Sequence, residues 1–146
     1  MIADASLHTM PTREVTVRTG TGTSIVDVTD ACASFLADTA DGGDGLLNLF
    51  LPHATAGLAL IELGAGSESD LRATLDRVLP RDASWTHAHG SPGHGADHVL
   101  PAFVSPSLVI PVVGGRMALG TWQSVALVDT NRENPERRLR LTFLPG

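Results

Sequence analysis

A chain of 146 residues can bury one substantial hydrophobic core, and 42% hydrophobic with 18% charged residues is ordinary for a folded protein. The formal net charge of −6 excludes a general nucleic-acid-binding protein, which would need a basic face. No apolar run reaches membrane-spanning length, and the single cysteine, Cys32, excludes an internal disulfide and a cysteine-based zinc cluster.

These properties predict a single cytoplasmic domain with no membrane partner. The N-terminus shows no signal-peptide pattern. Residues 1–11 have no hydrophobic period, so we expect a mobile N-terminal arm followed by one domain over residues 12–146.

Alternating or continuous apolar patterns predict strands along most of the chain. Residues 12–18 and 24–28 flank a glycine-rich turn and are expected to form a hairpin. Further strands are predicted at residues 46–51, 57–63, 108–113, 117–119, 124–129 and 137–143. In the last of these, RRLRLTF, arginines alternate with apolar residues, which indicates an edge strand with solvated arginines that discourage pairing.

Two segments have helical periodicity instead. The first is capped by Asp27 or Thr29, and the second by Ser67 with Asp70 three residues on. Their apolar stripes are Val28, Ala31, Cys32, Phe35 and Leu36, and Leu71, Leu75, Val78 and Leu79. The pattern predicts an α+β domain of mostly antiparallel sheet, with about seven or eight strands and two helices.

Four of the six histidines lie between Trp85 and His98, in WTHAHGSPGHGADH: His87, His89, His94 and His98. The glycines and proline of this segment argue against regular structure, and so long a loop is usually either functional or disordered. Imidazole is a common zinc ligand, and three such ligands plus a water make a catalytic site. His53 could add a ligand from elsewhere in the fold, whereas a solvated loop with incidental histidines is the alternative.

Two other kinds of site have weaker support. None of the nearby serines stands in a Gly-x-Ser-x-Gly elbow, which disfavours a nucleophilic triad. Turn residues could donate hydrogen bonds to a phosphate, although no Walker motif is present. The residues of that kind are Thr55, Ser107, Thr121 and Arg116.

Taken in order, several stretches resemble the YjbQ family of small proteins. Three stretches resemble the family's histidine motifs: His53-Ala54-Thr55-Ala56 with Glu62 after it, Trp85-Thr86-His87, and Asp97-His98-Val99. Asp70-Leu71 resembles its acidic-helix motif. The run SPSLVIPVVGGRMALGTWQ, residues 105–123, matches almost position for position. The ordered set covers roughly residues 12–143 and is specific, although each motif alone is modest.

The resemblance implies a sandwich-like α+β fold, a homotrimer, and a divalent metal ion, zinc, bound near a subunit boundary. Its ligands would be His53, His87 and His98, and the glycine-rich middle of the loop would let the last two converge. Glu62 and Asp70 would be pocket carboxylates and candidate general bases. The remaining pocket residues would be Thr55, Thr121, Trp122 and Gln123. His89 and His94 do not match family positions, and Ala54 and Ile61 depart from the family's polar residues.

The resemblance also implies a metal-dependent enzyme acting on a small phosphorylated or heterocyclic substrate. Family members are associated with a secondary thiamine-phosphate synthase activity, which joins a pyrimidine diphosphate to a thiazole phosphate and releases pyrophosphate. The alternative is a non-catalytic small-molecule binder, or a trimer with a structural metal site. A fully coordinated metal with no open position would favour that alternative.

Overall fold

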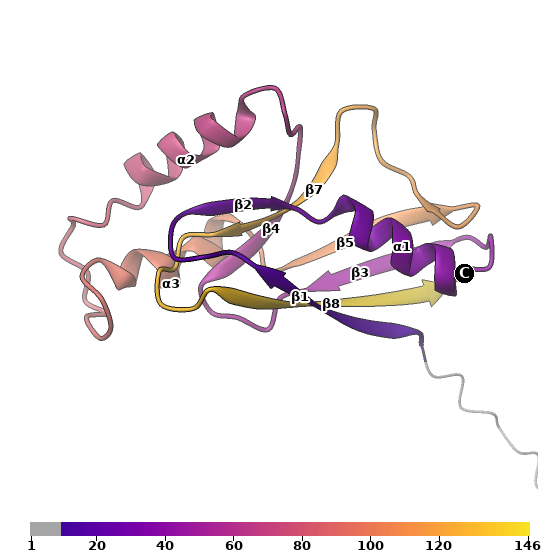
Figure 1. The fold of residues 1–146 in the computed structure, drawn as a ribbon, viewed down its shortest axis with the longest axis horizontal. Coiled ribbons are helices and arrows are strands. Elements are labelled where there is room, and N and C mark those ends of the chain that lie inside the picture. The colour runs from indigo at the N-terminus through magenta and orange to yellow at the C-terminus, as the bar shows by residue number, and fades with distance from the viewer. Residues whose placement is uncertain (1–9) are drawn as a thin grey trace, which may run out of the picture.

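The computed structural model describes residues 10–146, which form three helices and eight strands in two antiparallel sheets (Figure 1). The α+β, mostly antiparallel architecture is thereby confirmed. The predicted arm, residues 1–11, lies outside the described residues except for Met10 and Pro11. The Pro11 carbonyl accepts a hydrogen bond from the Phe143 N–H at 3.0 Å.

The larger sheet has five strands in the order β1-β8-β3-β5-β6. Their bounds are Thr12–Arg18 for β1, Glu136–Pro145 for β8, Gly45–Phe50 for β3, Ser107–Val113 for β5 and Arg116–Met117 for β6. The smaller sheet has the order β2-β7-β4, with bounds Ser24–Asp27, Ser124–Asp129 and Ala56–Ile61. All neighbouring strands are antiparallel.

The predicted hairpin between the first two strands is wrong. β1 pairs with β8, whereas β2 pairs with β7 in the other sheet. Gly20, with φ +73, lies in the turn that carries the chain from one sheet to the other. A glycine-rich turn indicates that the chain changes direction, but it does not identify the strand with which the next segment pairs.

The predicted edge position of the last strand is also wrong. β8 lies between β1 and β3 and pairs with both. Buried and exposed residues do alternate along β8. Arg137, however, is on the same inward face as Leu139 and Leu141 and is only 2% exposed. Arg138 and Arg140 are the side chains that face solvent.

The main core lies between the two sheets and is completed by α1, Thr29–Thr39. Cys32, Phe35 and Leu36 of its predicted stripe are fully buried. The predicted cap at Asp27 or Thr29 is wrong: Val28 precedes the helix without a side-chain cap, although the Asp27 carboxylate accepts a hydrogen bond from the Thr29 N–H at 2.9 Å. Burial, with a smaller contribution from Asp27, raises the pKa of the Cys32 thiol to about 12, so this cysteine is an inert core residue.

A second core covers the other face of the smaller sheet, where α2 (Ser67–Val78) and α3 (His94–Phe103) pack. Figure 1 shows α2 and α3 on one side of the molecule and α1 on the other. The buried residues of this core are Leu75, Leu79, Ala96, Leu100 and Val128. Two details of α2 were predicted wrongly: Gly66, with φ +104, precedes the helix in place of a Ser67 cap, and Val78 is half-exposed.

Helix α3 was not predicted, because Gly93, Gly95 and Pro101 all argue against a helix. Gly93 adopts φ +80 immediately before the helix, and Pro101 lies in its last turn. The burial of Ala96 and Leu100 in the second core outweighs the weak local propensity. The helix matters for function because it begins at His94 and contains His98.

Candidate metal centre

Four imidazoles gather where the loop after α2 folds back onto α3. The ring centroids of His87 lie 4.0 Å from His89 and 4.1 Å from His98, and those of His94 and His98 are 4.6 Å apart. One nitrogen each of His87, His89 and His94 lies within 4.8 Å of the others. The structure therefore brings together the predicted pair, His87 and His98, and adds His89 and His94 to it.

The spacing of these nitrogens suits a metal ion. The Nε2 atoms of His94 and His98 face each other at 2.9 Å. Two imidazoles on one tetrahedral zinc, with bonds near 2.0–2.1 Å, place their nitrogens roughly 3.3 Å apart. Burial, followed by the neighbouring His87, His94 and His89, lowers the pKa of His98, which favours the neutral form that binds metal.

Glycines allow the loop to lie against the helix. A Cβ at Gly95 would be 2.4 Å from the Trp85 Cβ and 2.7 Å from the His87 carbonyl oxygen. A Cβ at Gly93 would be 2.4 Å from the Arg81 carbonyl oxygen. The Trp85 indole N–H donates to the Pro80 carbonyl at 3.0 Å, which anchors the loop near the end of α2.

A buried carboxylate, that of Asp97, lies against the His94 ring of the imidazole cluster. Asp97 is fully buried, and its Oδ1 accepts hydrogen bonds from Arg81 at 2.6 Å and from the Thr130 hydroxyl at 2.8 Å. Its Oδ2 is 3.3 Å from the Nδ1 of His94. The Oε2 of Glu133 is 3.7 Å from the same nitrogen.

The loop after β7 provides that second carboxylate. Glu133 accepts a hydrogen bond from the Ser91 N–H, which lowers the pKa of its carboxyl group. This contact ties the histidine loop to the loop after β7. Sequence reasoning missed Arg81, Thr130 and Glu133, although one signal was available: Asp97 stands just before the apolar run of residues 99–104, and a carboxylate buried with such a run needs donors.

His53 lies apart from the four imidazoles. Its Nε2 accepts a hydrogen bond from the Arg138 N–H at 2.8 Å, and its Nδ1 is 3.5 Å from the guanidinium of Arg137. Burial, with Arg137 and Arg138, lowers the pKa of this imidazole. It borders a surface cavity of about 250 Å³, together with Thr16, Asn134, Glu136 and Arg138.

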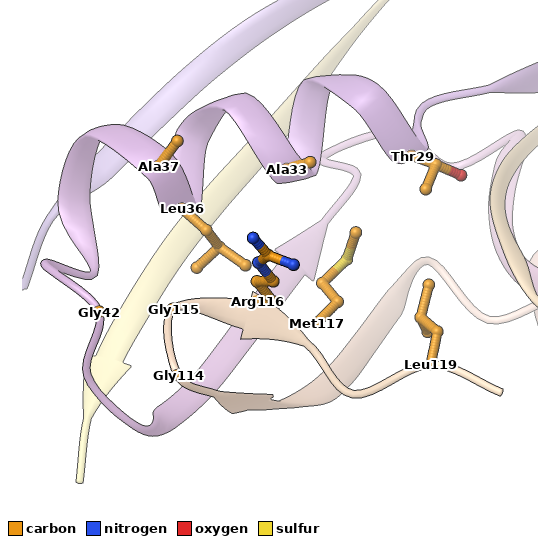
Figure 2. Close-up of a pocket in the computed structure, with 10 residues that line it drawn as sticks. All are labelled: Thr29, Ala33, Leu36, Ala37, Gly42, Gly114, Gly115, Arg116, Met117 and Leu119. Carbon is orange, nitrogen blue, oxygen red and sulfur yellow. The ribbon is translucent and has the colours of Figure 1, made fainter.

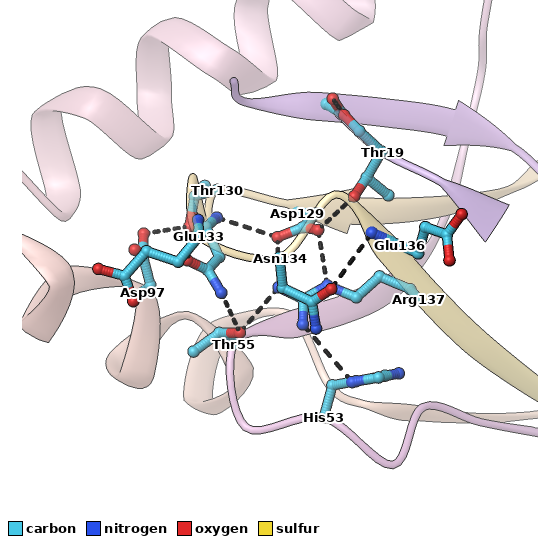
Figure 3. Close-up of polar contacts among 12 residues, drawn as sticks. Thr19, His53, Thr55, Asp97, Asp129, Thr130, Glu133, Asn134, Glu136 and Arg137 are labelled. Atoms are coloured by element: carbon cyan, nitrogen blue, oxygen red, sulfur yellow. Dashed lines mark hydrogen bonds and ion pairs between the residues drawn. The ribbon is translucent and has the colours of Figure 1, made fainter. Parts of the chain in front are cut away.

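A buried polar network connects His53 with Arg137, Thr55 and Asp129 (Figure 3). The Arg137 guanidinium forms a bidentate pair with Asp129, at 2.7 and 3.0 Å, and donates to the Thr55 hydroxyl at 2.9 Å. Thr19 also donates to Asp129, at 2.8 Å. Thr55, predicted to line the ligand pocket, is therefore a buried acceptor for Arg137.

The other predicted pocket residues are exposed. Glu62 and Asp70 face solvent, and neither is among the contacts that residues 10–146 make to the four imidazoles. Thr121, Trp122 and Gln123 form the loop before β7, and Trp122 is 72% exposed. Trp122 is therefore not a core residue of the single chain. Its ring is accessible in this chain.

A larger cavity than the one beside His53 lies between α1 and the turn that joins β5 to β6 (Figure 2). It encloses about 490 Å³ and is mainly apolar, with Leu36, Met117 and Leu119 on its walls. Arg116 projects into it in Figure 2. None of its lining residues belongs to the imidazole cluster.

Comparison with known proteins shows similarity over nearly the whole chain. A family model described as UPF0047 protein YjbQ-like matches residues 13–146. UPF0047 protein Rv2556c of Mycobacterium tuberculosis (strain H37Rv) is 62% identical over 122 residues, covering 84% of this chain and 90% of the relative.

Two solved structures share the fold. Hypothetical protein APE1520 from Aeropyrum pernix K1 aligns with a TM-score of 0.83 and 31% identity, covering 94% of this chain and 100% of the other. A YbjQ-like protein of unknown function, SSO2532 from Sulfolobus solfataricus P2, aligns with a TM-score of 0.87, covering 94% of this chain and 99% of the other. At 23% identity the second match supports the fold alone. Within residues 10–146, none of the helices has the length and apolar character of a membrane span.

Proposed function

The chain belongs to the UPF0047 YjbQ-like family, as its ordered motifs predicted, and from this we propose that it binds a divalent metal ion, zinc, through a histidine centre. The observation that carries the proposal is the convergence of four imidazoles: nitrogens of His87, His89 and His94 lie within 4.8 Å of one another, and the Nε2 atoms of His94 and His98 are 2.9 Å apart. Two neutral imidazoles can share one N–H···N hydrogen bond, as His94 and His98 do at 2.9 Å, whereas a shared zinc ion would use the lone pairs of several rings at once.

His87 and His98, which the resemblance implies as ligands, have ring centroids 4.1 Å apart, and this closeness supports assigning both to the centre. His53, the third ligand of the family pattern, contacts Arg137 and Arg138 in its own chain. We therefore assign it to the centre of a neighbouring copy in a homotrimer, so that the site lies at a subunit boundary.

An exposed apolar surface supports self-association. The outer face of the larger sheet has four large hydrophobic residues that are substantially exposed in the single chain: Leu46, Phe50, Val109 and Val113. On β3 and β5 these side chains alternate with buried ones, so they form one face rather than scattered positions. Contiguous apolar patches of this kind mark interaction sites. We assign this face to the contact between copies.

For the reaction, we propose a small phosphorylated or heterocyclic substrate in the cytoplasm, with thiamine-phosphate synthesis as a secondary activity. The bound metal would supply Lewis-acid activation of a substrate oxygen. Glu62 or Asp70 would accept a proton as general base, since both carboxylates are exposed and free to approach a ligand. Trp122 would stack on a ring, beside Thr121 and Gln123.

Metal analysis tests the centre directly. Protein purified without chelators should contain about one zinc ion per chain, and His87→Ala and His98→Ala should each lose it. Thr86→Ala, an exposed residue of the same loop, is the control and should retain the metal. Wild-type protein that contains no metal and has no affinity for added zinc would overturn the proposal.

Complementation tests the activity separately. A strain that lacks its main thiamine-phosphate synthase should grow without thiamine when this chain is expressed. No growth, with soluble protein present at high level, would rule out the secondary activity and leave the metal centre standing.

One observation favours the structural alternative: four imidazoles can fill a tetrahedral zinc and leave no open position. On that alternative, His53→Ala should weaken the trimer, and no turnover should be measurable with either protein.

A further inference from the structure

His94 has an orientation that the family pattern does not explain. It is the first residue of α3, it is only 6% exposed, and it precedes His98 by four residues. That spacing puts both imidazoles on one face of the helix, and their Nε2 atoms face each other at 2.9 Å. An incidental histidine at a helix start would more often point into solvent.

Two carboxylates flank the other nitrogen of this ring. Asp97 Oδ2 is 3.3 Å and Glu133 Oε2 is 3.7 Å from the His94 Nδ1. A nitrogen between two carboxylates carries the proton, because only the N–H form interacts favourably with them. The lone pair is therefore on Nε2, which points into the cluster.

Asp97 is held in place independently of His94. Arg81 and Thr130 saturate its Oδ1, whereas its Oδ2 and the His94 Nδ1, 3.3 Å apart, make no well-aligned hydrogen bond within residues 10–146. Zinc-binding histidines typically direct their second nitrogen to a carboxylate, which fixes the tautomer and the ring. The His94 Nδ1 is directed toward the Asp97 carboxylate in the same way, with its Oδ2 at 3.3 Å.

We propose that His94 is a ligand of the metal through Nε2 and that Asp97 is its positioning residue. This inference rests on the proposed metal centre and extends it. His87, His94 and His98 provide three ligands from one chain, so the centre assembles in a single copy. His53 of a neighbouring copy then closes a fourth position and is not required for binding.

Cadmium NMR identifies the ligands in the wild-type protein. Protein labelled with ¹⁵N-histidine and loaded with ¹¹³Cd should show metal–nitrogen coupling to the Nε2 of His94, assigned by its loss in His94→Gln. An uncoupled His94 in a cadmium-loaded protein would overturn the assignment.

Zinc affinity, measured by competition with a chromophoric chelator, gives a second readout. His94→Gln should weaken binding at least about tenfold, and Asp97→Asn roughly tenfold to a hundredfold, since supporting residues have effects of that size. Thr86→Ala, at an exposed residue of the same loop that is not part of the imidazole cluster, is the control and should bind as wild type does. Thermal unfolding with excess chelator checks that each variant folds.

Zinc binding by the wild type, His94→Gln and His53→Ala distinguishes a failure of this inference from a failure of the proposed metal centre. No zinc binding by the wild-type protein would overturn both. Binding that survives His94→Gln but disappears in His53→Ala would overturn only the inference and leave the three-ligand family set. Loss in both variants would overturn the claim that one copy suffices.

Discussion

Arg137 and Asp129 connect the two sheets through one buried ion pair. Arg137 is on β8 and Asp129 at the end of β7, and both are almost inaccessible to solvent. Arg137→Met should destabilise the protein by about 3–5 kcal/mol, because it leaves the Asp129 carboxylate buried without its counter-ion. The free energy of unfolding in urea measures the effect.

Arg138→Met is the matched control on the same strand. Its guanidinium is two-thirds exposed and 3.5 Å from Glu14, so the loss should stay below about 1 kcal/mol. Equal destabilisation by the two substitutions would contradict a cross-sheet role for Arg137.

His53 should make the metal-free protein less stable in acid. Burial, Arg137 and Arg138 lower the pKa of His53 in the folded chain below the value of about 6.5 expected when it is unfolded. The unfolded chain therefore binds the proton first as the pH falls. The contribution of the neutral imidazole is fully present above about pH 6.5 and is lost as the pH falls through the lower, folded-state pKa.

Urea unfolding between pH 5 and pH 8, with chelator present, measures this dependence. His53→Gln should show a shallower loss of stability in acid than the wild type. Identical pH profiles for the two proteins would show that His53 does not contribute.

The sequence predicted that arginines and apolar residues alternate in the last strand, but not which face is buried. Solvation of all three arginines was the simplest interpretation of RRLRLTF. Arg137 is buried only because Asp129, from a distant strand, lies opposite it. A pattern within one strand contains no information about that partner.

At the level of elements, the contact between the histidine loop and α3 depends on Gly95. Gly95→Ala should destabilise the protein by about 1–3 kcal/mol, because the new methyl group would overlap Trp85 and the His87 carbonyl. It should also weaken zinc binding, since His87 would be displaced from His98. Thermal unfolding and the chelator competition measure the two effects.

Gly22→Ala is the control, because nothing lies within 4 Å of the Cβ it would add and its backbone is not left-handed. Its effect should be below about 0.5 kcal/mol. If Gly95→Ala were equally harmless, the close approach of loop and helix would not be needed.

Most strands and two helices were predictable because each has its own hydrophobic period. β7 has the predicted bounds, Ser124–Asp129, and α1 buries Cys32, Phe35 and Leu36 of its predicted stripe. α3 was missed because its helical state comes from tertiary packing of Leu100 rather than from local propensity. The histidine cluster could be anticipated from the density of histidines between Trp85 and His98, whereas the contacts of Asp97 with Arg81 and Thr130 could not.

For the whole molecule, we expect the outer face of the larger sheet to control assembly. Val109→Glu, at a residue 58% exposed in the single chain, should convert the trimer to monomers, because a carboxylate would be buried at the interface. Light scattering coupled to size-exclusion chromatography measures the mass.

Val78→Glu is the matched control on α2, where the valine is 49% exposed on another face. It should leave the mass unchanged. A monomeric wild type, or trimers that tolerate Val109→Glu, would contradict this assignment of the interface.

The central position of β8 has a consequence for biosynthesis. β1 and β3 leave the ribosome well before β8, yet β8 is the strand that joins them. A nascent chain that lacks this strand presents two unpaired β edges and an open hydrophobic face to solvent. The larger sheet can therefore form completely only after β8 has been translated. Until then, we expect the nascent chain to need chaperones that shield aggregation-prone segments.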